Sequence, residues 1–403
     1  YKMKYDATRK TTVDAWREFR NKCSKRALVI MPVQTGELRE FAIKNNLFVL
    51  NLNKELGEAG AGQNISLLEE VLAWLEPNAP VYGWEQGVSE DQFVARVSKS
   101  GHPMIPCDWS YNHSLLSLLY EKGREQVLPR IFDPRSIDFK KKKNFVSFFL
   151  SDGDNIQWMM QDFASRYYDV PEAEDVKMTF GLPVATLAMM APVQFNNLMG
   201  LQKQNCSLME MLGGGYYYVD TYSQDNNRKT NLRVAAKRLA VSMRQYQIKL
   251  LGIMAMDVKS EAAKEAYQVY VDANDQLEGI VVLQYSPYAG GEGEVFWVTN
   301  KAGYDIPVIT VKYSLWDRIH EREGSPDFIA SKLKEEAQEE SFSVVCVHAW
   351  SRFEGDTYGA SAAKRCAERL DDRFEAINMQ ELVWRLRMSR RPEQTLDYLN
   401  KIY

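Results

Sequence analysis

The sequence predicts an α/β protein in two parts: a smaller α/β domain over residues 1–138 and a (β/α)8 TIM-like barrel over residues 139–403. A chain of 403 residues is long for one domain, since domains hold roughly 100–200 residues and barrels about 250. After residue 144 a β-rich run followed by a helical stretch occurs eight times. These runs are apolar nearly throughout, which indicates parallel strands covered by helices on both faces.

The eight predicted strands of the second part are residues 144–150, 177–182, 216–220, 249–256, 279–285, 307–313, 343–348 and 374–378. Helical patterns lie between them. Residues 230–247 carry apolar side chains at helical spacing, and Ser325 with Pro326 forms a helix start with a serine cap. Eight such units favour closure into a barrel over an open doubly wound sheet.

The first 138 residues repeat this alternation on a smaller scale. The predicted strands are residues 27–31, 47–53, 80–84 and 103–107, and a helix is predicted over residues 65–75 with Asn64 as its cap. Residues 129–138 mix Pro, Arg and Asp without periodicity, so we place the domain boundary there.

Composition excludes several classes of function. A net charge of −4 provides no basic surface for nucleic acid, and the lysines of residues 140–143 read as a solvated linker. No apolar stretch reaches the ~18 residues that a membrane span requires. The five cysteines and four histidines are scattered, so we expect no metal and no cofactor. The chain begins with Tyr1 rather than Met, which is typical of a mature or trimmed product and leaves room for a removed signal peptide.

Polar side chains follow most of the predicted strands. Barrel enzymes carry their sites at the C-terminal strand ends. Here strand one ends in Asp152, Asp154 and Asn155, strand three in Asp220, and strand seven in a segment with His348 and Trp350. The chain also holds 21 Tyr and 9 Trp, many of them in loops, where amphipathic rings suit planar or sugar-like ligands.

Asp152 and Asp154 are the sharpest feature. Two carboxylates two residues apart, just past a buried strand, can share a metal, or one can orient the other as a general acid or base. The alternative is a strand-to-helix turn in which Asp154 or Asn155 caps the next helix.

A glycine-tyrosine segment precedes Asp220. Gly213, Gly214 and Gly215 allow positive φ or a close approach to a ligand. Strand alternation then places Tyr216 and Tyr218 on one face. A flexible turn followed by a packed strand is the alternative.

A long glycine-rich loop follows predicted strand five. We expect its acids and tyrosines to contribute to the site together with a hydrogen-bonding and a stacking group from strand seven, namely Tyr285, Tyr288, Glu292, Glu294, His348 and Trp350. A mobile surface loop and a packed strand end are the alternatives.

Two of these segments resemble one family. Residues 213–218 are similar to the G-x-G-Y-x-Y-P signature of the GxGYxYP putative glycoside hydrolases, and residues 151–155 are similar to its S-D-G-D-N element. Val219 stands where the signature has proline. The resemblance covers essentially the whole chain. It implies a TIM-barrel C-terminal domain, a carbohydrate ligand and a Bacteroidetes-type protein that is secreted, periplasmic or at the cell surface.

Glycoside hydrolysis on a poly- or oligosaccharide is therefore the leading hypothesis. It requires two carboxyl groups, for which we favour Asp152 with Asp220 and keep Asp154, Glu292 and Glu294 as candidates. A non-catalytic glycan-binding protein would use the same aromatic residues without a carboxyl pair. A haloacid-dehalogenase-type phosphatase, suggested by the D-x-D spacing, and a metal-dependent deacetylase are weaker alternatives.

Overall fold

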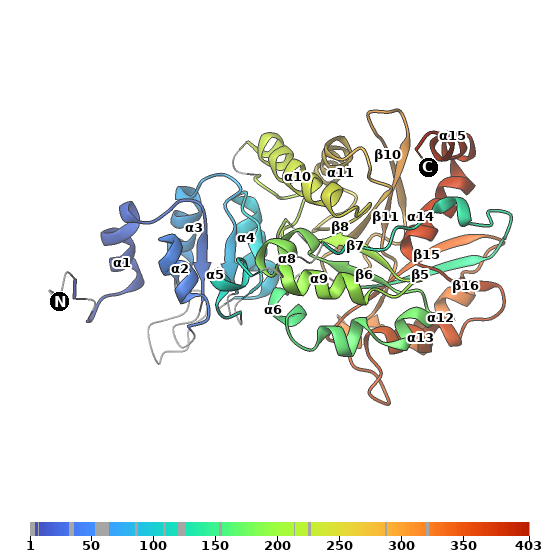
Figure 1. Cartoon of the computed structure of the whole chain (residues 1–403), viewed down its shortest axis with the longest axis horizontal. Coiled ribbons are helices and arrows are strands. Elements are labelled where there is room, and N and C mark those ends of the chain that lie inside the picture. The colour runs from blue at the N-terminus through green and yellow to red at the C-terminus, as the bar shows by residue number, and fades with distance from the viewer. Residues whose placement is uncertain are drawn as a thin grey trace.

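The computed structural model describes residues 5–6, 8–31, 36–52, 64–84, 88–107, 110–119, 126–152, 155–212, 214–224, 227–286, 288–319 and 322–402. Within them lie two main sheets, one formed before residue 106 and one formed after residue 143. Figure 1 shows the first sheet and its helices at one end of the molecule, in blue, and the second sheet at the other.

The first sheet has four parallel strands in the order β2-β1-β3-β4. They are β1 (Leu28–Ile30), β2 (Phe48–Leu50), β3 (Val81–Gly83) and β4 (Met104–Ile105). The predicted strands of this region are thus confirmed, although each is shorter than its apolar run. Helices pack around them: α1 (Thr12–Phe19), α2 (Arg39–Asn45), α3 (Ile65–Trp74), α4 (Glu90–Lys99) and α5 (His113–Leu116). A single 3₁₀ turn, η1 (Arg20–Lys22), follows α1.

The second sheet is curled and mostly parallel, in the order β10-β11-β9-β8-β7-β6-β5-β15-β12. Its strands are β5 (Asn144–Leu150), β6 (Thr179–Leu182), β7 (Ser207–Met211), β8 (Leu250–Ala255), β9 (Gly279–Gln284), β10 (Val295–Thr299), β11 (Asp305–Thr310), β12 (Tyr313–Leu315), β15 (Ser341–Val347) and β16 (Phe374–Ala376). β13 (Arg318–Ile319) and β14 (Arg322–Glu323) form a separate hairpin.

The predicted α/β class is confirmed, whereas an eight-stranded (β/α)8 barrel is not. The last strand, β16, pairs with the first half of β5 on the side of β6, and β15 pairs directly with β5. The two ends of the parallel path, β11 and β12, are consecutive in the chain and only Val311 and Lys312 separate them. The sheet therefore curls as a barrel does, but with a different strand order and with an added antiparallel strand, β10.

One predicted strand is wrong. Residues 216–220 form only two isolated bridges, and the third strand of the sheet is β7. The tyrosine run has a higher β-propensity than the sequence Ser-Leu-Met-Glu-Met of β7, which contains no β-branched residue. Local preference thus indicated the wrong segment.

Helices cover the outer face of the curled sheet (Figure 1). They are α6 (Ile156–Met159), α7 (Pro171–Asp175), α8 (Val184–Met190), α9 (Pro192–Leu201), α10 (Arg228–Gln245), α11 (Glu261–Ala273), α12 (Pro326–Glu335) and α13 (Gly359–Glu368), with α14 (Met379–Arg390) and α15 (Pro392–Ile402) closing the chain. A 3₁₀ turn, η2 (Pro134–Ser136), and a π-helical turn, η3 (Ala164–Tyr168), complete the helical segments. None of the helices within the described ranges is both long and apolar enough to span a membrane.

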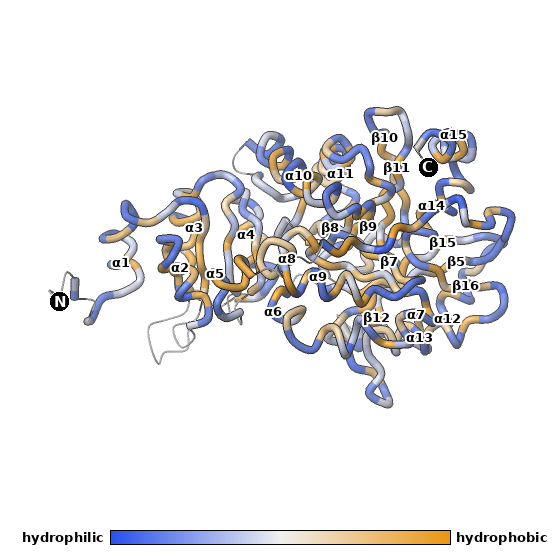
Figure 2. Tube along the Cα trace, in the orientation of Figure 1, coloured by the Kyte–Doolittle hydropathy of each residue, from blue (hydrophilic) through white to orange (hydrophobic). Residues whose placement is uncertain are grey.

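The strands of the curled sheet are buried on both faces. Phe145 and Phe149 of β5 belong to one buried cluster with Val383 of α14, and Phe148 belongs to another with Tyr267 of α11. Figure 2 shows the apolar residues concentrated along these central strands and the hydrophilic ones on the outer loops. Burial on both faces explains why these strands read as continuous apolar runs.

The glycine-tyrosine segment joins the two sheets. The main chain of Tyr216 exchanges two hydrogen bonds with Met104 of β4, at 3.0 and 2.6 Å, and Val219 N donates to the carbonyl of Met254 in β8 at 2.9 Å. Gly215 has φ +104°, and a Cβ there would lie 2.5 Å from Cβ of Pro103. Glycine is therefore needed at this position for both its conformation and its lack of a side chain.

Candidate active site

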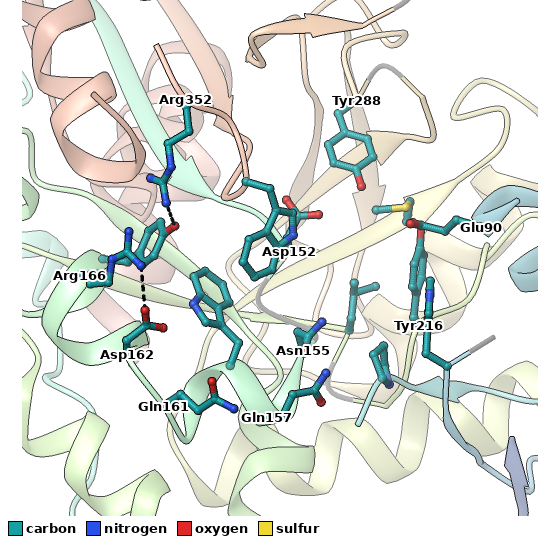
Figure 3. Close-up of a pocket in the computed structure, with 17 residues that line it drawn as sticks. Glu90, Asp152, Asn155, Gln157, Gln161, Asp162, Arg166, Tyr216, Tyr288 and Arg352 are labelled. Atoms are coloured by element: carbon teal, nitrogen blue, oxygen red, sulfur yellow. Dashed lines mark hydrogen bonds and ion pairs between the residues drawn. The ribbon is translucent and has the colours of Figure 1, made fainter. Parts of the chain in front are cut away.

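A cavity of about 560 Å³ lies where the two parts of the chain meet (Figure 3). Trp84, Glu90 and Pro106 line it from the first part. The second part contributes the segment after β5, the turns around α6 and η3, and residues from the loops after β7, β9 and β15. The site is therefore made by both domains, not by the strand ends of one.

Asp152 stands directly after β5 and faces this cavity (Figure 3). Its Oδ2 accepts a hydrogen bond from Oγ of Ser151 and one from the backbone N of Ala349 at 3.4 Å. Its φ of +61° is uncommon for a residue with a side chain, although aspartate tolerates the left-handed region better than most. Strained positions of this kind gather at functional sites, and here the side chain is held by hydrogen bonds from the preceding residue and from the segment after β15.

Glu90 is the second carboxyl group, and it comes from the other domain. It is the first residue of α4, after Ser89 at the N-cap position, and its Oε1 accepts a hydrogen bond of 2.9 Å from the Tyr216 hydroxyl. Burial raises the pKa of Glu90, and the nearby charges of Asp152 and Asp91 act in the same direction. The hydrogen bond from Tyr216 opposes that rise without overcoming it. Glu90 therefore holds its proton to a higher pH than an ordinary glutamate.

His348 lies behind Asp152 rather than in the cavity. Its Nε2 is 3.9 Å from Oδ2 of Asp152, its Nδ1 is 3.0 Å from Oγ of Ser351, and its ring stacks on Trp316 at 3.8 Å between centroids. Burial lowers the pKa of His348, although Asp152 acts in the opposite direction. A neutral imidazole in this place can orient Asp152 by packing beside it and by placing a polar ring nitrogen near its carboxylate.

Aromatic and cationic side chains line the end of the cavity that lies away from Glu90 (Figure 3). The rings of Trp158 and Trp350 lie 4.6 Å apart, and Trp350 is 49% exposed. Arg166 pairs with Asp162 at 2.9 Å. Arg352 donates to the Tyr167 hydroxyl at 3.2 Å. A half-exposed indole with polar groups beside it can stack against a sugar ring and bind its hydroxyl groups.

The structure brings together some of the residues predicted for the site. Asp152, Asn155, Tyr216, Tyr288 and Trp350 all line the cavity. Asp154 lies outside the described residues. Tyr218 and Tyr285 are not in the lining but stand behind it, with ring centroids 5.4 Å apart.

Asp220 does not join Asp152, which corrects the predicted pair. Its two carboxylate oxygens accept hydrogen bonds from the backbone N of Met256 at 3.0 Å and of Asp257 at 2.9 Å. Asp220 is 8% exposed and does not line the cavity. Because both oxygens hold the chain after β8, the geometry gives Asp220 a structural role.

Glu292 and Glu294 also lie elsewhere. Both pair with Lys259, at 3.7 and 3.0 Å, and both side chains are well exposed. Neither lines the cavity, to which their loop contributes Tyr288 instead.

Sequence reasoning missed Glu90, Trp84, Arg166 and Arg352. The only signal for Glu90 is a helix start, Ser89 followed by two acids, which is common on protein surfaces. In the part of the chain that the structure describes, no group of three or more His, Cys, Asp or Glu residues is arranged to hold a metal ion.

Comparison with known proteins shows which family the chain matches. Residues 142–387 match the GxGYxYP putative glycoside hydrolase C-terminal domain, and residues 25–118 match the GxGYxYP third domain. No curated protein sequence matches the chain. The fold is similar to the crystal structure of a putative hydrolase from Bacteroides thetaiotaomicron VPI-5482, with a TM-score of 0.78 and 18% identity, over 96% of this chain and 70% of that one. The chain belongs to the GxGYxYP putative glycoside hydrolase family.

Proposed function

We propose that this protein is a glycoside hydrolase in which Glu90 is the general acid and Asp152 is the nucleophile or general base. The observation that carries the proposal is that two carboxyl groups from different domains line one cavity, and that burial raises the pKa of one of them. Glycosidases need such a pair in unequal protonation states, one to protonate the leaving oxygen and one to act while ionised.

The roles follow from the surroundings of each group. Glu90 is the better proton donor because its pKa is raised, and Tyr216 fixes its orientation. Asp152 uses Oδ2 for its hydrogen bonds, and no described residue donates to Oδ1. This arrangement leaves one oxygen free to act on a sugar carbon or on a water molecule.

Binding of the saccharide is assigned to the aromatic end. Trp350 offers a half-exposed apolar ring face with the buried Trp158 beside it, while Asn155, Gln157 and Gln161 offer amide groups along the cavity floor (Figure 3). This mixture suits a hydroxylated ring with apolar faces. The extracellular or cell-surface location that the family resemblance implies belongs to the same proposal.

The experiment is a glycan panel that measures product release and binding separately. Glu90→Gln and Asp152→Asn should each reduce turnover by about 10³-fold or more while leaving affinity within a few-fold, because these groups act mainly in the transition state. Glu261→Gln is the matched control, since Glu261 also begins a helix after a serine cap but does not line the cavity. Binding across the panel with no product from the parent protein would instead favour a non-catalytic glycan-binding protein.

A further inference from the structure

The charges that line the cavity are separated along its length. Figure 3 places Glu90 on one side of Asp152 and the two arginines, Arg166 and Arg352, on the other. Among the described residues, Asp162 is the one carboxylate that lines the arginine end. Two guanidinium groups and one carboxylate leave this end with a net positive charge, in a chain whose overall charge is −4.

Arg352 accounts for the net positive charge of this end, because Arg166 is paired with a carboxylate. Arg166 forms its ion pair with Asp162 at 2.9 Å. Arg352 instead makes a hydrogen bond to an uncharged partner, the Tyr167 hydroxyl, at 3.2 Å. Its Nη1 is buried and finds no acceptor among the described residues. A guanidinium carries five N–H donors, and among the described residues only the Tyr167 hydroxyl accepts a hydrogen bond from Arg352.

Arg352 is also held in place. Its guanidinium carbon lies 3.7 Å from the centroid of the Tyr358 ring and 6.0 Å from that of Tyr167. Stacking on an aromatic ring suits the planar, weakly hydrated guanidinium and reduces the entropy that is lost when it binds an anion. A planar fork with free donors matches a carboxylate or a sulfate group.

The charge of Arg352 lies beside indole rings of the kind that bind sugars. Trp350 lies two residues before Arg352, and its ring is in contact with that of Trp158. A pyranose ring stacked on the half-exposed Trp350 would bring an exocyclic group toward the arginines. The same group is disfavoured at the opposite end, because the carboxylate of Asp152 would repel it and no cation lines that end among the described residues.

We propose that the arginine end is a subsite for an acidic sugar, so that the saccharide recognised by this cavity carries a carboxylate or a sulfate group. This inference deepens the proposed function and rests on it for the identity of the ligand as a saccharide. It assigns Arg352 as the residue that determines specificity for the charged group and Arg166, already paired, as a supporting donor.

The test compares sugars that differ only in the charged group. The probes are glucuronate, glucose 6-sulfate and glucose, with galacturonate, galactose 6-sulfate and galactose as a second set, and binding is measured by calorimetry on the full chain at low and high salt. We expect at least one charged sugar to bind about tenfold or more tightly than its neutral counterpart, with a preference that weakens in high salt.

Arg352→Met retains the length of the side chain and removes its charge. It should weaken binding of the charged sugar by about 10- to 100-fold and change binding of the neutral sugar by less than about threefold. Arg352→Lys should recover part of the loss, because it restores the charge without the planar fork. Arg369→Met is the matched control: Arg369 pairs with Asp327 outside the cavity and should leave all affinities unchanged.

The outcomes separate this inference from the proposed function. A preference for charged sugars in Glu90→Gln, together with no turnover by the parent protein, would support the subsite and contradict the hydrolase. Turnover of charged and neutral glycans by the parent protein at similar rates, with Arg352→Met changing neither rate, would overturn the subsite and keep the hydrolase. Equal affinity for the charged and neutral members of every set would also overturn it, whereas a preference for sulfate over carboxylate, or the reverse, would support it and identify the group.

Discussion

The Tyr216 hydroxyl donates a hydrogen bond to Oε1 of Glu90 at 2.9 Å, and the main chain of the same tyrosine pairs with Met104 of β4. One residue of the second domain thus holds both the edge of the first domain's sheet and the carboxyl group that the first domain contributes to the site. The two contacts use different atoms of Tyr216, so they can be separated by mutation.

Tyr216→Phe removes the hydrogen bond and retains the backbone pairing. Because this hydrogen bond lowers the pKa of Glu90, its loss should raise that pKa further and move the high-pH limb of the activity profile to higher pH. We also expect kcat/KM to fall by about tenfold, since the acid is less well oriented. The measurement is a pH–rate profile of kcat/KM. Tyr217→Phe, which removes a hydroxyl bonded to Tyr270 instead, should leave the profile unchanged.

Glu90→Gln should stabilise the fold at neutral pH. In the parent protein the pKa of Glu90 is raised in the folded state, so the folded chain retains a proton that the unfolded chain loses above about pH 4.3. Stability therefore falls as pH rises from there through the folded pKa. The variant lacks this loss, so its advantage in free energy of unfolding should be larger at pH 8 than at pH 4 in urea titrations.

Glu261→Gln is the control for this stability effect. Glu261 also begins a helix after a serine cap, but its side chain is 89% exposed. The same substitution there should give a difference that does not grow between pH 4 and pH 8. A stability advantage for Glu90→Gln that is equal at both pH values would contradict the raised pKa.

Gly215→Ala should disrupt the junction of the two domains. The added methyl group would lie 2.5 Å from Pro103 and 3.0 Å from the Met104 carbonyl, at a φ of +104° that alanine rarely adopts. We expect a loss of about 3 kcal/mol or more in free energy of unfolding. Gly214→Ala, where the nearest atom is 3.9 Å away, should cost far less. Similar losses for the two variants in thermal unfolding would argue against this account of the signature glycine.

Asp220→Asn tests the structural role assigned to that carboxylate. An amide can accept at only one of the two positions that receive backbone N–H groups, so we expect a loss of about 1–3 kcal/mol in stability. Turnover per folded molecule should stay within a few-fold of the parent. Loss of turnover at unchanged stability would return Asp220 to the catalytic pair.

The sequence predicted the strands of the first sheet because each is a short apolar run bounded by turn residues. It could not identify β7, because Glu210 is buried within that strand, where its Oε2 accepts a hydrogen bond from Ala185. Nor could it show that the hydrogen bonds of residues 216–219 go to two different sheets. Tertiary pairing decides both cases, and local propensity does not report it.

The residues of the candidate site also include some that the sequence could predict and some that it could not. Asp152 was predictable because it follows a buried strand of the parallel sheet, where ligands bind. Glu90 was not, because its importance comes from facing Asp152 across the cavity, a relation between residues 62 positions apart that no local pattern encodes.

The boundary between the two matched family domains passes through this cavity. The C-terminal match, residues 142–387, contains Asp152, and the match that contains Glu90 ends at residue 118. A gene fusion or a chimaera that exchanged either domain alone would separate the two carboxyl groups while leaving the glycine-tyrosine signature intact. Within the family, a protein that retains the signature but carries a different partner domain would keep the architecture and lose the proposed pair of carboxyl groups.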